Sequence, residues 1–362
     1  MGSNRLEIKT KSKNYPVYIG KNSLEEFRET ILKFGGKILF LIDKNVNKKC
    51  SDLVEQILSS SDSDHHLIID CREKNKSLIT VQKILKYIIE NQFDRSSSIV
   101  SIGGGVLGDI SGFVASIFMR GIKYYQIPTT ILSAVDSSVG GKTGVNFQNV
   151  KNLVGTFHQP EGVFINTEFF KTLPKREIIS GIGELVKYAL IESKYYDFYV
   201  KEIKNIFFNK EVSESVIETS IKIKADIVER DEKEEYGIRR ILNLGHTFGH
   251  GFESASKYKL KHGEAVFWGI YLAILLSIRI GLLPKESKYK FIEDFGFIPI
   301  NKIIKKIDIT SVINFMKNDK KNFLGFIRLV LPGETRIFID IPIKEKIIFR
   351  TLERFKESLV IK

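Results

Sequence analysis

The chain has 362 residues, 43% of them hydrophobic, so it can bury a sizeable core and is long enough for two domains. Its 56 lysine and arginine residues exceed the 43 aspartate and glutamate residues, which leaves a net charge of +13. No dense basic run is interleaved with aromatic residues, so the charge indicates a lysine-rich surface or attraction for a small anion rather than nucleic-acid binding.

Cysteine usage and hydropathy indicate the compartment. Cys50 and Cys71 have no metal-like spacing, which predicts a reducing, cytoplasmic environment and no disulfide framework. The N-terminal MGSNRLEIKT has no apolar stretch of the signal-peptide type. The most apolar run starts at Ala265 and is interrupted after about a dozen residues by Ser277, whereas a membrane-spanning helix needs about 20. We therefore expect a buried core helix there and no membrane partner.

The first half of the chain alternates β-rich runs with helical patterns. The patterns predict helices at 23–35 and 77–92, each opened by a serine cap, and strands at 37–43, 65–70, 97–105 and 124–130. Such alternation predicts a parallel sheet covered on both faces, with a ligand site at the carboxyl ends of its strands. From about residue 172 the periodicity is mainly helical, including 176–193 and 212–230. We therefore predict an α/β domain over residues 1–170 and a mostly helical domain over 171–362.

A glycine-rich turn follows the third predicted strand. Gly103, Gly105 and Gly108 fit G-x-G-x-x-G, which indicates a tight strand-to-helix turn or a turn that binds a pyrophosphate. The usual acidic residue about 20 residues later is missing, which departs from the standard dinucleotide pattern. Asp43 ends the first predicted strand with Asn45 nearby, and could bind a ribose or serve as an ordinary turn residue.

Residues 128–146, PTTILSAVDSSVGGKTGVN, concentrate hydroxyls, an acid, a Gly-Gly pair and Lys142. This composition predicts a loop that approaches a ligand closely, with an ordinary surface loop as the alternative. Arg120, Lys151 and Asn152 add the cationic and amide donors that a phosphate recruits.

Glu184 and Lys187 are three residues apart in a predicted helix, a spacing typical of a solvated ion pair. Gly181 and Gly183 lie in the same helix, where each costs about 1 kcal/mol relative to alanine. Close approach by a substrate or by another helix would account for them.

Three of the six histidines lie within LNLGHTFGHGFE and KHGEAV. His246 and His250 are four residues apart, and such a pair on a helix can chelate zinc with a third ligand from elsewhere. Spacing alone makes His262 the simplest third ligand. Carboxylates are the alternative, and spacing does not choose among Glu184, Glu253 and Glu264.

Taken together, these segments resemble the 3-dehydroquinate synthases, sugar-phosphate cyclases of the shikimate pathway. Between about residues 40 and 270 the matching blocks are GGGVLGDISGFVAS, RG, PTTILSAVDSSVGGKTGVN, KNLVGTFHQP, TLPKREIISGIGELVKY, DEKEEYGIRRILNLGHTFGHGFE and HGEAV. Beyond them only NDKKN at 318–322 matches. The resemblance implies a Rossmann-like NAD-binding domain, a C-terminal mostly α-helical metal- and substrate-binding domain, and an active site in the cleft between them.

The implied activity is cyclisation of an anionic sugar-acid phosphate, 3-deoxy-D-arabino-heptulosonate 7-phosphate, to 3-dehydroquinate and phosphate. It would proceed by transient oxidation with NAD, phosphate elimination, re-reduction and aldol closure, with Zn²⁺, or alternatively Co²⁺, bound. The resemblance also implies a homodimer in which Arg120 reaches the neighbouring active site.

Carried over by position, the resemblance assigns roles to individual residues. The implied metal ligands are Glu184, His246 and His262, which leaves His250 on the substrate side. The implied substrate and catalytic residues are Arg120, Lys142, Asn152, Lys187, Lys224, Arg239, Asn243, His250 and either Lys320 or Lys321. The implied cofactor contacts are Asp43, Asn45, Glu73, Lys76, Gly104, Gly105, Val106, Asp109, Thr129, Thr130, Leu132, Asp136, Ser137, Lys142, Lys151, Asn152 and Thr172. The segment DEKEEYG is about one residue longer than the family's usual pattern, which bears on the register of Lys224.

Three other functions compete with this one. A cyclase that makes an inosose, a valiolone or an amino-quinate would share the scaffold, but Arg239, Asn243 and SSVGGKTG are the set expected for a dehydroquinate synthase. A metal-dependent alcohol dehydrogenase resembling the glycerol dehydrogenases would accumulate NADH. A non-catalytic nucleotide-binding module would not need the intact set of ligands and cations.

Overall fold

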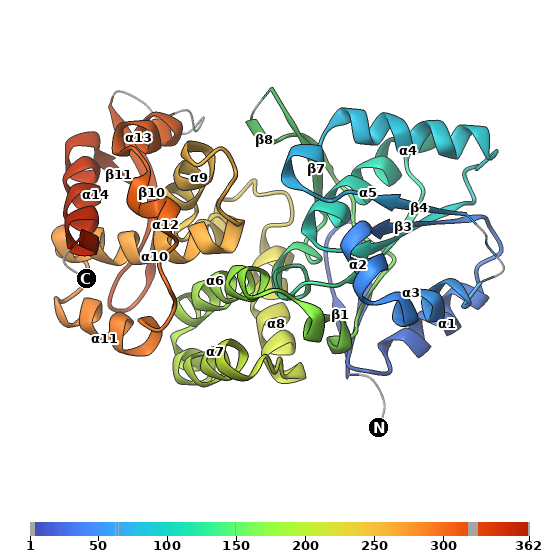
Figure 1. Cartoon of the computed structure of the whole chain (residues 1–362), viewed down its shortest axis with the longest axis horizontal. Helices are drawn as coiled ribbons and strands as arrows, with labels where there is room; N and C mark the ends of the chain where they lie inside the picture. Colours follow the sequence, from blue (N-terminus) through green and yellow to red (C-terminus); the bar gives the residue numbers. More distant parts are fainter. Residues whose placement is uncertain (1–3, 62, 64, 149, 318–324, 361–362) are drawn as a thin grey trace. The chain divides into compact units, whose positions relative to one another are not determined.

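The computed structural model describes residues 4–61, 63, 65–148, 150–317 and 325–360. The chain forms two compact units (Figure 1). Unit 1 comprises Met1–Pro174 and Asn209–Lys233, and unit 2 comprises Lys175–Phe208 and Glu234–Lys362.

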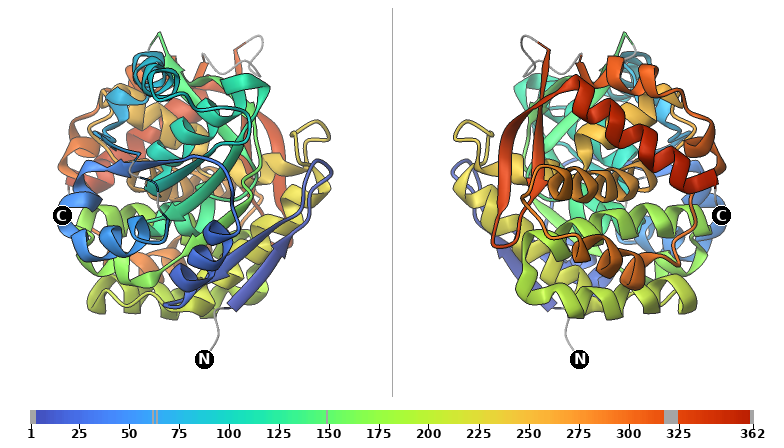
Figure 2. Two further views of the ribbon diagram at one scale, coloured as in Figure 1. Left: turned by 90° about the vertical axis from the view of Figure 1, so that its right-hand side faces the viewer. Right: turned by 90° about the vertical axis from the view of Figure 1, so that its left-hand side faces the viewer.

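Unit 1 is built on a seven-stranded sheet of order β1-β2-β9-β6-β5-β3-β4 (Figure 1; Figure 2, left). The strands are β1 (Asn4–Ile8), β2 (Tyr15–Ile19), β3 (Ile38–Asp43), β4 (His66–Ile69), β5 (Ser98–Gly103), β6 (Lys123–Pro128) and β9 (Gly162–Ile165). The pair β1–β2 is antiparallel and all other pairs of this sheet are parallel. The predicted parallel sheet and its four predicted strands are therefore confirmed.

Helices pack around this sheet. They are α1 (Ser23–Leu32), α2 (Lys44–Lys49), α3 (Ser51–Leu58), α4 (Leu78–Glu90), α5 (Gly105–Ile117) and α8 (Glu214–Arg230), and short helical turns lie at η1 (Glu73–Asn75), η2 (Phe118–Arg120), η3 (Ser133–Ser137) and η4 (Thr167–Thr172). Val81, Ile84 and Ile88 of α4 recur at helical spacing and pack into one core cluster with Leu41 of β3 and Ile110 of α5. This packing holds the loops at the carboxyl ends of β3 and β5 on a rigid base.

The segment 209–233, assigned to the second domain by the predicted boundary at residue 170, groups here with unit 1. Its helix α8 contacts β1, β2 and η3. The backbone N–H of Lys9 donates to Glu229 Oε1 at 3.0 Å, and that of Ser12 donates to Glu232 Oε2 at 3.0 Å. The helical periodicity was predicted correctly, but the sequence pattern does not show against which sheet a helix packs.

Unit 2 is mostly helical, as predicted. Its helices are α6 (Lys175–Ile191), α7 (Tyr196–Asn209), α9 (His246–Ala255), α10 (His262–Arg279), α11 (Glu286–Phe295), α12 (Lys302–Lys306), α13 (Ile309–Lys317) and α14 (Glu345–Val360), with turns η5 (Ser193–Tyr195) and η6 (Ile238–Asn243). The apolar run from Ala265 is the buried helix α10. A hairpin of β10 (Phe326–Pro332) and β11 (Ile337–Lys344), which the sequence analysis did not predict, contacts α14 through β11 (Figure 2, right). Within the described ranges, no helix has both the length and the apolar content needed to cross a membrane.

Two local predictions are wrong. Residues 128–146 are not one loop, because they contain η3 and the strand β7 (Lys142–Phe147), which pairs with β8 (Val150–Phe157). Glycines face each other in this hairpin at Gly144 and Gly155, so its sequence lacks the usual strand alternation. The predicted serine cap of α1 is wrong, because Ser23 follows the N-cap residue Asn22. Ser77 is the N-cap residue of α4, as predicted, but its side chain makes no cap hydrogen bond.

Glycines allow α6, α9 and α10 to touch through their backbones. A Cβ added at Gly183 of α6 would lie 2.0 Å from the carbonyl oxygen of Gly263 in α10. One added at Gly263 would lie 1.7 Å from the carbonyl oxygen of Ser180, and one at Gly269 would lie 2.1 Å from that of Gly245. The approach of another helix therefore accounts for the glycine at position 183.

We predict that Gly183→Ala destabilises the protein although it adds helix propensity. Alanine would normally gain up to about 1 kcal/mol inside a helix, but forcing a methyl group into packed backbone costs about 1–3 kcal/mol. Denaturant midpoints should therefore fall for Gly183→Ala. The control is Gly35→Ala, where the added Cβ meets nothing within 4 Å and stability should stay within about 0.5 kcal/mol. Equal midpoints for the two variants would contradict the tight contact.

Candidate active site

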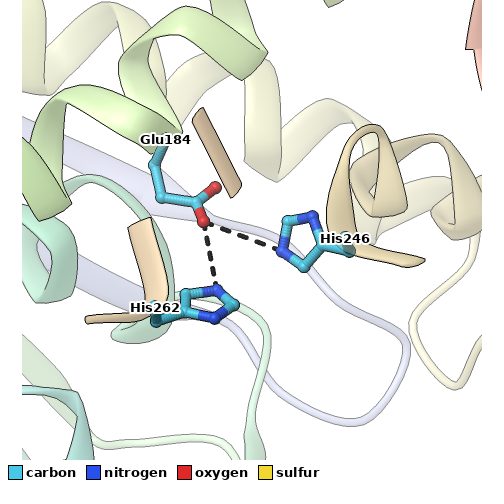
Figure 3. Close-up of side chains that lie close together, drawn as sticks. All are labelled: Glu184, His246 and His262. Atoms are coloured by element: carbon cyan, nitrogen blue, oxygen red, sulfur yellow. Dashed lines mark ion pairs between the residues drawn. The ribbon is translucent and has the colours of Figure 1, made fainter. Parts of the chain in front are cut away.

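Three side chains from three helices of unit 2 converge on one point (Figure 3). Glu184 comes from the middle of α6, and His246 and His262 are the first residues of α9 and α10. Glu184 Oε1 lies 3.7 Å from His246 Nε2 and 3.3 Å from His262 Nε2. One ligand atom from each residue lies within 4.8 Å of the others. This is the set that the family resemblance implied.

Each of the two rings is held through its other nitrogen. His246 Nδ1 lies 3.2 Å from the carbonyl oxygen of Leu244, and His262 Nδ1 lies 3.0 Å from Glu253 Oε2. Both Nε2 atoms are left facing the Glu184 carboxylate. Two ring nitrogens and one carboxylate oxygen match the donors of catalytic zinc sites, which keep a fourth position for substrate or water.

Local spacing alone would have chosen a different set. His250 lies on α9, one turn after His246, and its ring centroid is 5.5 Å from that of His246. Its nearest cluster of possible ligand atoms, however, contains Glu253 and His262 rather than Glu184. The pair of histidines four residues apart is therefore divided between two neighbouring groups.

The three candidate carboxylates have different surroundings. Glu184 lies among the histidines, whereas Glu253 contacts His262 from the other side. Glu264 pairs instead with Arg176, whose Nη2 is 2.6 Å from Glu264 Oε2, and accepts a hydrogen bond from the Lys261 backbone N–H at the start of α10.

The electrostatics of the two candidate histidine ligands differ. Burial lowers the pKa of His246 to about 3, with cationic Lys187 adding to the effect and Glu184 opposing it. Burial by itself would also lower the pKa of His262, but the carboxylates of Glu253 and Glu184 raise it to about 10. A metal ion would therefore meet a neutral His246 and would displace a proton from His262.

Lys187 forms a buried ion pair with Glu184. The Nζ–Oε2 distance is 2.5 Å, and the two side chains are 1% and 0% exposed. The prediction of a solvated ion pair from the spacing is therefore wrong, because most of α6 is buried. A lysine kept charged in such a place needs its carboxylate partner.

The turn η6 carries two further candidate substrate residues, the buried Arg239 and the half-buried Asn243. Left-handed glycines flank it, with φ of +80° at Gly237 and +78° at Gly245. Arg240, between the two candidates, pairs with Asp340 of β11. The unpredicted hairpin thus anchors the turn.

In unit 1 the glycine motif forms the predicted turn between β5 and α5. Gly104 is the N-cap residue of α5, and a Cβ on it would lie 3.1 Å from Thr130 Cγ2. A Cβ on Gly105 would lie 2.8 Å from Ser137 Oγ and 3.7 Å from Leu132 Cδ2. The Thr129 N–H donates to the Gly103 carbonyl oxygen at 3.0 Å. Most of these residues belong to the implied cofactor set, and here they surround one helix N-terminus.

A second cluster gathers around the buried Lys76. Its ammonium pairs with Asp109 of α5 and donates to Asn152 Oδ1. Burial raises the pKa of Asp109, and Lys76 opposes this effect. Lys151 Nζ lies 3.6 Å from Glu73 Oε1. The structure thus brings together five of the residues assigned to cofactor or phosphate.

Asn146, which was not predicted as a site residue, connects the members of this cluster by hydrogen bonds. Its side-chain amide donates to Glu73 Oε1 at 2.8 Å, and its backbone N–H donates to the Lys76 carbonyl oxygen at 2.9 Å. Its Oδ1 accepts from the Asn152 N–H at 3.0 Å. Asn146 could have been identified as an amide side chain in the polar segment 128–146. That segment was predicted to be a loop, so the strand that positions Asn146 was not recognised.

Lys224 reaches the same unit through α8. Its Nζ lies 3.0 Å from Asp136 Oδ1 and donates to the Asp136 carbonyl oxygen at 2.5 Å. Lys224 therefore contacts Asp136, a residue of the implied cofactor set.

The remaining predicted residues occupy separate places. Asp43 caps α2 by accepting a hydrogen bond from the Asn45 N–H at 2.7 Å, which is the turn role considered for it in the sequence. Thr172 Oγ1 lies 3.3 Å from Cys50 Sγ, and Val106 packs against the sheet core.

Two cations predicted to contact the substrate are exposed. They are Lys142, at the start of β7, and Arg120, at the end of η2. Lys320 and Lys321 lie outside the described residues.

Two family profiles match the chain. The profile of the 3-dehydroquinate synthase N-terminal domain matches residues 66–180, and that of the C-terminal domain matches residues 181–322. The 3-dehydroquinate synthase of Pelagibacter ubique is 41% identical over 91% of this chain and 92% of its own length. That of Dictyoglomus turgidum is 41% identical over 96% and 97%, respectively.

Solved structures show the same fold. A 2-deoxy-scyllo-inosose synthase complexed with carbaglucose-6-phosphate, NAD⁺ and Co²⁺ superposes with a TM-score of 0.85 at 25% identity, covering 97% of this chain and 99% of that one. The glycerol dehydrogenase of Schizosaccharomyces pombe superposes with a TM-score of 0.66 at 16% identity, covering 99% and 92%. Because the curated relatives share so much more sequence over nearly the full length, the chain belongs to the 3-dehydroquinate synthase family of enzymes.

Proposed function

We propose that this chain converts 3-deoxy-D-arabino-heptulosonate 7-phosphate into 3-dehydroquinate and phosphate, within the shikimate pathway. The observation that carries the proposal is the convergence of Glu184, His246 and His262 beside the buried Lys187. Dehydroquinate synthases share about 40% of their sequence with this chain, against 25% for the inosose synthase. This difference favours dehydroquinate over the products of the other cyclases.

A zinc ion, or alternatively cobalt, would be held by Glu184, His246 and His262. The donor set fits, because both Nδ1 atoms are engaged elsewhere and both Nε2 atoms face the carboxylate. The metal would supply Lewis-acid chemistry by lowering the pKa of the substrate hydroxyl that is to be oxidised. The inosose synthase structure that superposes on this chain contains Co²⁺.

NAD would be held at the β5–α5 turn, where Gly104 is the N-cap residue and Gly105 the first residue of α5, because a helix N-terminus suits a pyrophosphate. NAD would supply hydride chemistry, accepting a hydride and returning it later in the same cycle. Residues of this chain would bind and orient it. Asp43 at the end of β3 offers a carboxylate for a ribose. The ion pair between Lys76 and Asp109 would hold α5 in position beside the cofactor. We assign the other residues of the implied cofactor set to NAD binding as well.

The substrate would be held through its carboxylate and phosphate. Arg239 offers a guanidinium that suits a carboxylate, and Asn243 lies on the same turn. Lys142, Asn152 and Arg120 would orient the phosphate, with Lys224 and His250 completing the set. In this scheme the protein mostly positions the substrate and stabilises its developing charge.

We further propose a cytoplasmic homodimer in which Arg120 serves the neighbouring subunit. Met119 and Arg120 have φ of +47° and +66°, so this exposed tip is held in a strained conformation. Strand β8 exposes apolar side chains, with Val150, Leu153 and Phe157 at 50%, 42% and 43%. Such a surface suits contact with a second copy of the chain.

The activity can be tested with the purified protein, NAD, zinc and the heptulosonate phosphate. We expect release of one phosphate per dehydroquinate formed and no net NADH, because the hydride returns to the substrate. Phosphate release and absorbance at the NADH band are followed in the same sample. Sustained accumulation of NADH would favour the alcohol-dehydrogenase alternative, and no phosphate release would rule out the cyclase.

The metal ligands can be separated from His250 by substitution. Glu184→Gln should weaken zinc binding by more than about 100-fold, beyond the usual cost of losing an outer-shell partner. His250→Ala should retain zinc but lose activity. Glutamine is preferred to alanine because it keeps a polar partner for the buried Lys187. Zinc content after dialysis against a chelator is the readout, and equal losses would restore the set His246, His250 and His262.

Sharing of the active site between subunits can be tested by complementation. Arg120→Ala and His246→Ala should each be inactive alone, but a mixed dimer holds one site with both intact groups. Random co-expression should therefore recover about a quarter of the wild-type activity, since half of the dimers are mixed and each has one intact site of two. No recovery in dimers shown to be mixed would place Arg120 in its own subunit's site.

A further inference from the structure

Glu253 is a buried carboxylate beside the candidate metal ligands that has no assigned role. It lies on α9, two helical turns after His246, and its residue is 1% exposed. Its Oε2 lies 3.0 Å from Nδ1 of His262, whose Nε2 lies 3.3 Å from Glu184 Oε1. The imidazole of His262 is therefore held between two carboxylates.

This contact determines which nitrogen of the His262 ring is available to a metal ion. A ring that donates Nδ1–H to a carboxylate is fixed in one tautomer and one orientation, with the Nε2 lone pair available to a metal. The side chain of His262 is 29% exposed, whereas that of His246 is 13% exposed. Without Glu253 the more exposed ring would gain freedom to rotate toward solvent.

The two histidines are anchored by unlike acceptors. His246 Nδ1 meets a backbone carbonyl oxygen, that of Leu244, which no substitution at that position removes. His262 Nδ1 meets the charged carboxylate of Glu253 from a different helix. A charged acceptor raises the basicity of the ring more than a neutral one does, so His262 depends on its partner more strongly.

A ligand role for Glu253 itself fits less well. Glu253, His250 and His262 also have possible ligand atoms within 4.8 Å of one another. However, Nδ1 of His262 cannot bind a metal while it donates a hydrogen bond to Glu253 at 3.0 Å. Its Nε2, in contrast, already faces Glu184.

We propose that Glu253 is a positioning residue that orients His262 for metal binding. The inference rests on the proposed metal site formed by Glu184, His246 and His262. It adds that the affinity of that site depends on a carboxylate outside the ligand set.

The test measures zinc affinity of the full chain by competition with a chromophoric chelator. Glu253→Gln keeps the size of the side chain and replaces the charged acceptor with a neutral one, so it should weaken zinc binding about tenfold. Glu253→Ala removes the acceptor and should weaken zinc binding by nearly 100-fold. The visible absorption of the Co²⁺-loaded protein should change in the same order, because it reports on ligand geometry. A purely structural role would not change that spectrum.

Glu264→Gln is the matched control. Glu264 is also buried, at 5% exposure, and lies two residues after His262, but it pairs with Arg176. This variant should lose stability and keep its zinc affinity and cobalt spectrum.

The outcomes separate the two proposals. Wild-type affinity in Glu253→Gln and Glu253→Ala, or equal losses in Glu253→Gln and Glu264→Gln, would overturn the role of Glu253 and leave the metal site standing. Failure of the wild-type chain to bind zinc would overturn the metal site, and this inference with it.

Discussion

The candidate metal site depends on backbone contacts between α6, α9 and α10. Packed helices normally lie 8–10 Å apart, and glycines allow a closer approach. Each candidate ligand adjoins a glycine of these contacts: Gly183 precedes Glu184, Gly245 precedes His246, and Gly263 follows His262. The ligand positions are therefore set by main-chain atoms, which are stiffer than side chains. The cost falls on α6, which carries Gly183 in its interior.

Buried charge is the second feature of this site. Glu184 and Glu253 are almost fully buried carboxylates, and Lys187 places a cation within the same volume. Burying such groups is unfavourable unless they are paired, so a core built for stability alone would replace them with apolar residues. Their presence, together with Gly183 inside α6, is typical of a site where local stability is given up for function.

How far the sequence predicted this structure can be seen from particular elements. The strand at 37–43 and the helix at 176–193 were predicted because their apolar patterns are long and regular. The hairpin β7–β8 was missed because facing glycines interrupt its alternation. The hairpin β10–β11 was missed although its strands have 7 and 8 residues, because Pro342 within β11 is unfavourable for a strand. Local spacing could not choose Glu184 over His250, since that choice depends on which helices cross. The set that the fold brings together was predicted only from the resemblance to a family, which rests on long matching blocks of sequence.

Anomalous X-ray diffraction from the zinc-loaded protein tests the candidate metal site most directly, because it locates the metal. We expect one strong peak bounded by the carboxylate of Glu184 and the Nε2 atoms of His246 and His262, with zinc–nitrogen distances of about 2.0–2.1 Å. A peak between His250, Glu253 and His262, or none near these helices, would contradict it.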